Sequence, residues 1–313
     1  MLNFIIKRLL TSILVIIGVT IVIFSLVHMA PGDPVQMMAG LDAKEEDIEA
    51  FRAKMGMDKP LIVQYFNYVK GLLHLDLGKS IITNKNISDE IFFRFRNTAE
   101  LAVAGMLISS VFGIISGIIA AVNRDRWLDK TLMSLSITGI SMPSFLLALL
   151  LMLLLVSQWH LLPASGREGS PFTAEGFKYI ILPALTLGIS GTASIARLTR
   201  SSVVAVLNEE FVMTLKAKGL RRKMILFKHI LRNASLPILT MIGLDFGYLL
   251  GGAVVTETIF AWPGIGKYAM DAISQNDFPA VQGAVLILSM MFMLINLVVD
   301  LLYGVLDPRV SLE

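Results

Sequence analysis

The chain has 313 residues, of which 55% are hydrophobic and only 16% are charged, and its net charge is +3. Soluble domains usually carry about 25% charged residues, so this composition indicates an integral membrane protein. The sequence contains no cysteine, which excludes disulfides, thiolate catalysis, zinc–thiolate sites and iron–sulfur clusters.

Six apolar segments are each long enough to cross a bilayer, which takes about 20 residues of helix. The first, residues 9–27, resembles a signal peptide but is longer than the usual apolar core of about 7–15 residues, so we expect an uncleaved helix. The fourth is the weakest, because it is short and contains Pro183, Gly188 and Gly191. The sequence therefore predicts an all-α membrane protein with six transmembrane helices, the last five at residues 101–122, 132–156, 179–196, 237–256 and 280–303.

Lysine and arginine in the short loops predict the orientation, because they are enriched on the cytoplasmic side. They concentrate in residues 1–8, 123–131 and 197–236, which places both the N-terminus and the C-terminus inside. The long outer loop, residues 28–98, has mixed charges and amphipathic stretches that predict a small helical external subdomain. We therefore divide the chain into residues 1–97, the first helix with this subdomain, and residues 98–313, a five-helix core.

The inside segment 197–236 is long for a mere connection. Asn208 can cap a short helix that ends in basic residues and at Gly219, a glycine suited to a helix C-terminus. A second amphipathic helix follows, and Pro237 is expected to open the fifth span. Two interpretations remain open: a basic surface that touches lipid headgroups, or a docking element for a soluble partner.

Two other features have both a packing interpretation and a functional one. The fifth span carries Gly243, Gly247, Gly251 and Gly252, a small-residue stripe that suits either packing within the chain or a smooth wall at a pore or subunit interface. The outside segment 257–279 contains a Trp-Pro-Gly sequence at residues 262–264. It predicts either an interfacial tryptophan with an ordinary turn or a re-entrant gate beside a pore.

Catalytic motifs are missing from the sequence, and its four histidines are scattered. We therefore expect no enzyme activity, no metal site, no cofactor bound by this chain and no nucleic-acid partner. A stand-alone secondary transporter would usually bury charged groups at mid-membrane, and Asp245 is a weak candidate for that role. A membrane-bound enzyme or scaffold is the third hypothesis, and it lacks a polar catalytic cluster.

Residues 211–220 (FVMTLKAKGL) and 228–237 (KHILRNASLP) together resemble the cytoplasmic "EAA" coupling loop of permease subunits in binding-protein-dependent ABC importers. The form is that of the branch that includes dipeptide, oligopeptide, glutathione and nickel permeases. Further similarity lies at residues 30–34, 58–65, 76–80, 139–143, 251–252, 257–264, 277–282 and 300–309, the last of which includes 307–309. The chain departs from the pattern at Leu215, where Ala is usual, and at Met213, where Glu is frequent.

This resemblance implies a type I ABC importer permease fold in the bacterial inner membrane. It implies four kinds of partner: a homologous second permease in a heterodimer, two cytoplasmic ATPase subunits, an extracytoplasmic solute-binding protein and the lipid bilayer. ATP and Mg would be bound by the ATPase subunits. The resemblance favours a short peptide as substrate, with nickel or a nickel chelate as the alternative.

The resemblance also suggests roles for single residues. The ATPase contact would comprise Thr214, Leu215, Lys216, Ala217, Lys218, Gly219, Leu220, Arg221 and Met224. Residues expected to hold this loop to the inner helix ends are Lys228, His229, Arg232, Asn233 and Pro237. Residues expected to line or gate the outer mouth are Glu257, Phe260, Trp262, Pro263, Gly264 and Gly266, and the glycine stripe would form the wall of the path.

Overall fold

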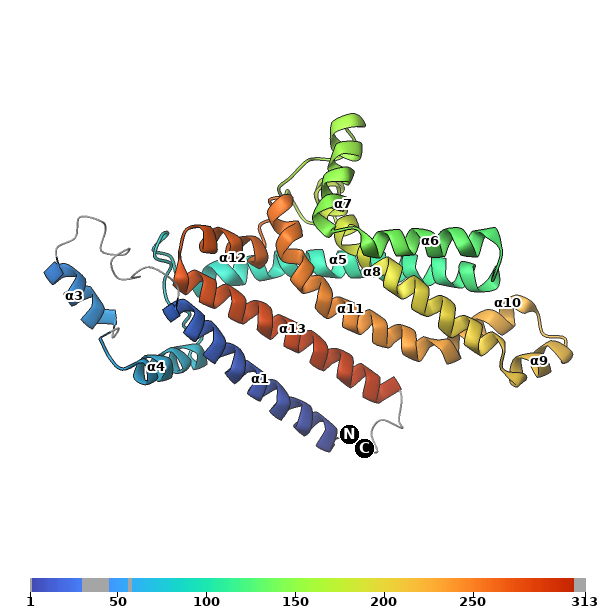
Figure 1. Ribbon diagram of the computed structural model, residues 1–313, viewed down its shortest axis with the longest axis horizontal. Helices are drawn as coiled ribbons and strands as arrows, with labels where there is room; N and C mark the ends of the chain where they lie inside the picture. Colours follow the sequence, from blue (N-terminus) through green and yellow to red (C-terminus); the bar gives the residue numbers. More distant parts are fainter. Residues whose placement is uncertain (1, 30–44, 56–57, 307–313) are drawn as a thin grey trace. The chain divides into compact units, whose positions relative to one another are not determined.

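The computed structural model describes residues 2–29, 45–55 and 58–306, and the segments 30–34 and 307–309 singled out above lie outside these ranges (Figure 1). Within the described ranges the chain is helical, and the only β-pairing is an isolated bridge between Lys79 and Asn86. Five helical segments are long and apolar enough to span a membrane, and a bent pair of helices makes a sixth. The all-α, six-span expectation is therefore confirmed.

The helices extend beyond the apolar segments that the sequence marks. Helix α1 covers Leu2–Met29, α5 covers Ile87–Val122, α8 covers Ala174–Leu207, α11 covers Leu231–Ile259 and α13 covers Phe278–Leu306. The weak fourth segment is part of α8, which begins where the Thr173 side chain accepts a hydrogen bond from the Gly176 amide. Much of α8 is buried inside the protein, so it needs less apolar surface than a helix that faces lipid.

The third span is broken, where a continuous helix was expected. Helix α6 (Trp127–Ser141) ends just before Pro143, and α7 (Ser144–Leu151) continues into a π-helix, η1 (Met152–Gln158), after a bend of 108°. Proline lacks an amide hydrogen and disfavours helical geometry at the residue before it, which explains the break at Met142.

The chain divides into two compact units. One contains residues 1–5, 98–262 and 292–313, and the other contains residues 6–97 and 263–291. The boundary at residue 97 coincides with the division made from the sequence, whereas residues 263–291 group with the N-terminal part. As a domain boundary, residue 97 stays a prediction.

In the first unit α8 packs against α6, α7 and α11. One apolar core joins Leu101 of α5, Leu187 of α8 and Leu249 of α11, and the fully buried Trp262 belongs to it. Glycines allow the close approach: a Cβ at Gly188 would lie 2.7 Å from Cγ2 of Ile108. The close contact explains why α8 carries the glycines that weaken its apolar pattern.

The second unit contains most of α1, α3 (Glu45–Met55), α4 (Leu61–Leu73), α12 (Ile265–Ser274) and the adjoining turns of α5 and α13. Ile87 and Ile91 at the start of α5 are buried, and a Cβ at Gly283 of α13 would lie 2.7 Å from Cγ2 of Ile87. Along the chain, helices α3 and α4 come after α1 and before α5, in the segment where the sequence predicts an external helical subdomain.

Candidate functional site

The coupling-loop candidate is helical almost throughout. Its first part, residues 197–207, continues α8, and a short helix, α9 (Glu210–Ala217), follows. Asn208 ends α8 instead of opening α9, whose N-cap is Glu209. After Gly219 the chain enters α10 (Arg222–Met224) and the π-helix η2 (Ile225–Ile230), which leads directly into α11.

Gly219 ends α9 in the way its sequence position predicts. Its φ of +77° is the left-handed conformation that glycine adopts at helix C-termini. The Gly219 amide donates to the Lys216 carbonyl at 3.0 Å, and the Leu220 amide donates to the Leu215 carbonyl at 3.3 Å. This pair of bonds is a Schellman motif, and its usual apolar contact fits Leu215 and Leu220, which pack on the same core.

Apolar side chains hold α9 to the long helices. Val212 of α9 is fully buried together with Val203 of α8 and with Ile225 and Ile230 of η2. Ala121 at the end of α5 belongs to the same cluster. Displacing α9 would open this shared core, so α9, α8 and the start of α11 are mechanically linked.

The opposite face of the loop is exposed and mixes apolar with basic side chains. Met213 is 71% exposed and Phe227 is 63% exposed. Leu215 and Leu220 are half-buried, whereas the other residues expected to contact the ATPase are exposed: Thr214, Lys216, Ala217, Lys218, Gly219, Arg221 and Met224. Methionine and phenylalanine are enriched at protein interfaces, so these exposed side chains suit contact with a partner better than contact with water.

The residues expected to hold the loop to the inner helix ends lie mostly at the surface. Lys228, Arg232 and Asn233 are exposed, His229 is half-buried, and the Asn233 amide donates locally to the His229 carbonyl at 3.0 Å. Pro237 was expected to open the fifth span, but it lies inside α11, which begins at Leu231. A proline inside a helix has no amide hydrogen, so α11 lacks the i→i−4 hydrogen bond at this position. The apolar cluster that does support the loop is not apparent from charge or capping patterns.

A buried ion pair adds α6 to this assembly. Arg200 of α8 donates to both carboxylate oxygens of Asp129 at 2.5 and 2.6 Å, and the Asp129 side chain is only 3% exposed. The Asp125 amide also donates to Asp129 at 2.9 Å. Arg200 lies about two turns before the C-terminus of α8, and α9 follows that end. The bidentate pair therefore fixes the start of α6 to the helix that leads into the coupling segment.

The segment expected to gate the outer mouth is packed tightly. Helix α11 ends at Ile259, and Ala261, with φ of +47°, forms the turn that follows. Glu257, Phe260 and Trp262 are fully buried. The Thr98 hydroxyl donates to Glu257 at 2.6 Å, and the Gly166 amide donates to the Phe260 carbonyl at 2.8 Å.

Arg167 provides a second contact to this turn that the sequence does not indicate. Its guanidinium lies 5.6 Å from the centre of the Trp262 ring and pairs with Glu100 at 2.7 Å. The tryptophan is therefore held by a cation and by core packing, rather than exposed as an interfacial side chain.

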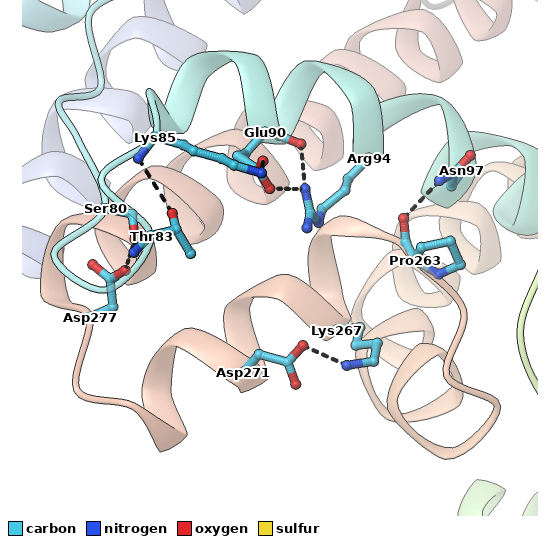
Figure 2. Close-up of polar contacts among 10 residues, drawn as sticks. All are labelled: Ser80, Thr83, Lys85, Glu90, Arg94, Asn97, Pro263, Lys267, Asp271 and Asp277. Atoms are coloured by element: carbon cyan, nitrogen blue, oxygen red, sulfur yellow. Dashed lines mark hydrogen bonds and ion pairs between the residues drawn. The ribbon is translucent and has the colours of Figure 1, made fainter.

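The residues that follow this turn belong to the other unit, which is held by several separate polar contacts (Figure 2). Asn97 donates to the Pro263 carbonyl at 2.7 Å, and Gly264 and Gly266 beside it are buried. Asp277 accepts from the Ser80 hydroxyl at 2.5 Å and from the Ile81 amide at 3.2 Å, which holds the loop after α4 to the start of α13. On α12, burial raises the pKa of Tyr268 to about 12, and the Arg94 guanidinium lies 4.6 Å from the centre of its ring.

The glycine stripe of α11 serves mainly for packing within the chain. A Cβ at Gly243 would collide with Val299, and one at Gly247 would lie 2.8 Å from Cε2 of Phe292, both on α13. Gly252 faces α8 at ordinary contact distance. Gly251 has no atom within 4 Å of an added Cβ, so it alone remains available for an interface or path wall.

An apolar cavity of about 390 Å³ lies beside the first of these glycines. Thr240 contributes the only polar side chain among the described residues of its wall. The other residues that line it are Met106 of α5, Leu236, Leu239, Ile242, Gly243 and Phe246 of α11, and Leu294, Ile295, Val298 and Val299 of α13. A cavity with so few polar groups does not suit a charged peptide, so we do not assign substrate to it.

Comparisons with known proteins agree with these features. The family described as "Binding-protein-dependent transport system inner membrane component" matches residues 113–312, and the corresponding N-terminal family matches residues 1–102. The glutathione transport system permease protein GsiC of Escherichia coli O6:H1 (strain CFT073) is 42% identical over 310 residues, 99% of each chain. The dipeptide transport system permease protein DppB of Escherichia coli K12 is 42% identical over 335 residues, again with 99% of each chain covered.

Two solved structures share the fold. The MetNI methionine ABC transporter in an inward-facing conformation has a TM-score of 0.57 at 15% identity, covering 69% of this chain and 96% of that one. An amino acid ABC transporter has a TM-score of 0.52 at 14% identity, covering 71% and 94%. These similarities confirm the ABC importer permease fold, and the sequence relatives identify a permease subunit rather than an enzyme. The chain belongs to the family of binding-protein-dependent transport system inner membrane components.

Proposed function

We propose that this permease forms half of the translocation pathway of an ATP-driven importer for short peptides, with glutathione or a dipeptide as substrate. The observation that carries the proposal is the similarity to glutathione and dipeptide permeases, 42% identity across 99% of the chain. No comparable observation favours nickel, the alternative suggested by the resemblance.

The assembly we propose contains a homologous second permease, two cytoplasmic ATPase subunits and an extracytoplasmic solute-binding protein. Family membership supports a partnership with an ATPase and a binding protein. The basic residues around α9 support a cytoplasmic location for this helix, and hence an N-in and C-in topology in the bacterial inner membrane.

The exposed face of α9, α10 and the first turn of η2 is the proposed ATPase contact. Met213, Met224 and Phe227 offer apolar area, and Lys216 and Lys218 offer charge. The face is continuous with the loop residues from Thr214 to Arg221 named above. Methionine adapts to irregular surfaces, so Met213 would offer apolar contact where the family pattern frequently has glutamate.

Motion of the ATPase subunits would reach the membrane through this chain's packing. The buried cluster of Val212, Val203 and Ile225 ties α9 to α8 and α11, so a push on α9 moves these helices together. The Asp129–Arg200 pair brings α6 along. ATP and Mg bound on the partner subunits would supply the driving force.

The outer turn is the proposed gate. Phe260 and Trp262 are buried, and Thr98, Arg167 and the Gly166 amide hold the turn in place. We infer that this packing closes the outer end in the present conformation. Of the remaining gate residues, Gly264 and Gly266 would allow the chain after the turn to rearrange, whereas Pro263 restricts the backbone next to Trp262.

The test is uptake by the complete complex, reconstituted in proteoliposomes with internal ATP and its binding protein. Labelled glutathione, a labelled dipeptide and nickel are supplied separately. The proposal predicts uptake of a peptide that requires ATP and the binding protein. Nickel uptake without peptide uptake would show that the substrate is nickel and not a peptide. ATP-independent uptake by this chain alone would refute the importer assignment.

A further inference from the structure

Helix α4 has three different faces. Tyr65, Tyr68 and Leu72 turn toward the protein and are half-buried, whereas Asn67 and Lys70 are exposed on the opposite side. Between these faces runs an exposed apolar stripe formed by Ile62, Phe66 and Leu73, which are 61%, 65% and 80% exposed. The three residues share one side because their spacings correspond to about whole turns of a helix.

The packing face of α4 contacts the last turns of α1 (Figure 1). The hydroxyls of Tyr65 and Thr20 are 3.0 Å apart, and Gln64 is 3.1 Å from Nε2 of His28. The ring of Phe24 lies 5.4 Å from that of Tyr65. These contacts fix the position of α4 along the axis of α1.

That position lies within the depth of a membrane. The apolar span of α1 is Ile6–Met29, 24 residues, which slightly exceeds the thickness of a bilayer's hydrocarbon core. Thr20 precedes Met29 by nine residues, or about 14 Å along the helix. The Tyr65 hydroxyl therefore reaches below the membrane surface, and α4 lies at the boundary between headgroups and acyl chains, where tyrosine is favoured.

We propose that α4 is an interfacial membrane helix, whose stripe of Ile62, Phe66 and Leu73 inserts among the acyl chains of the leaflet opposite the N-terminus. Continuity with α1 supports lipid as the occupant, because Leu14 and Leu26 of that span are also exposed. Asn67 and Lys70 face the headgroups and water, as on other amphipathic helices that lie in the interface. The stripe thereby anchors the external subdomain at a fixed height above the bilayer.

The absence of cysteine from the sequence makes a direct test possible. Phe66→Cys and Asn67→Cys are matched variants, one turning toward the stripe and one toward water, and Leu14→Cys is the lipid-facing reference. The full chain is placed in lipid nanodiscs, and a nitroxide on each cysteine is examined for collision with oxygen, which concentrates in acyl chains, and with a water-soluble nickel chelate.

The proposal predicts an oxygen-to-nickel accessibility ratio several-fold higher at position 66 than at position 67, and lower than that at position 14, because Leu14 lies nearer the middle of the span. Similar ratios at positions 66 and 67 would overturn it, because the stripe would then lie in the same environment as the polar face. Shielding of position 66 from both reagents would also overturn it and indicate a protein contact. The test requires no transport, so its outcome is independent of the proposed substrate and of the ATPase contact.

Discussion

Replacing Gly219 tests whether the shape of the coupling segment matters for transport. Proline cannot adopt the φ of +77° found there, and it lacks the amide that donates to Lys216. The combined cost to the turn is roughly 3 kcal/mol, which lowers the population of the formed turn about 100-fold. Steric bulk contributes little, because no atom lies within 4 Å of an added Cβ.

Gly219→Asn is the matched control, because asparagine tolerates the left-handed region and keeps its amide. The assay compares assembly with the ATPase subunits, substrate-stimulated ATP hydrolysis and uptake in the reconstituted complex. We expect Gly219→Pro to assemble but to lose both stimulated hydrolysis and uptake, whereas Gly219→Asn retains most of each. Equal uptake by the proline variant and the wild type would refute the coupling role of the turn.

Three further predictions concern the packing around the site. Arg200→Ala leaves the buried Asp129 carboxylate unpaired and should lower the free energy of unfolding by about 3 kcal/mol, measured by reversible unfolding in bicelles; an unchanged stability would contradict the clamp. Glu257→Ala should cost about 1–3 kcal/mol in the same measurement, since it removes the buried acceptor of Thr98, while Glu257→Gln should cost less; equal losses would show that the acceptor is unimportant. Gly117→Ala places a Cβ 2.5 Å from that of Thr199 and should destabilise by about 1–3 kcal/mol, whereas Gly251→Ala, in open space, should not; the reverse order would contradict the packing.

Features that depend on neighbouring residues could be predicted from the sequence. The apolar segments reveal the spans because each spanning helix satisfies its own backbone hydrogen bonds. The Schellman turn at Gly219 is equally local, since one helix and one glycine determine it. The extent of α8 was underestimated because a helix buried by other helices can carry glycine and proline.

Contacts between distant parts of the chain could not be predicted in this way. Asp129 and Arg200 are 71 residues apart, and Thr98 and Glu257 are 159 residues apart, so no local pattern pairs them. Pro143 explains the position of the break in the third span, whereas the 108° angle between α6 and α7 depends on how these helices pack on α8. Charged and capping residues drew attention to Lys228 and Arg232, whereas the buried cluster that supports the loop is distributed over several helices.

The central claim, that the exposed face of α9 docks on the ATPase, is tested most directly by site-specific crosslinking. Met213→Cys introduces a cysteine on that face, and Phe172→Cys introduces one on the loop before α8, which the topology places outside and which is 96% exposed. Each variant carries a photoactivatable crosslinker in the assembled complex. The account predicts a covalent adduct with the ATPase subunit from position 213 and none from position 172. No adduct from position 213, or adducts from both positions, would contradict it.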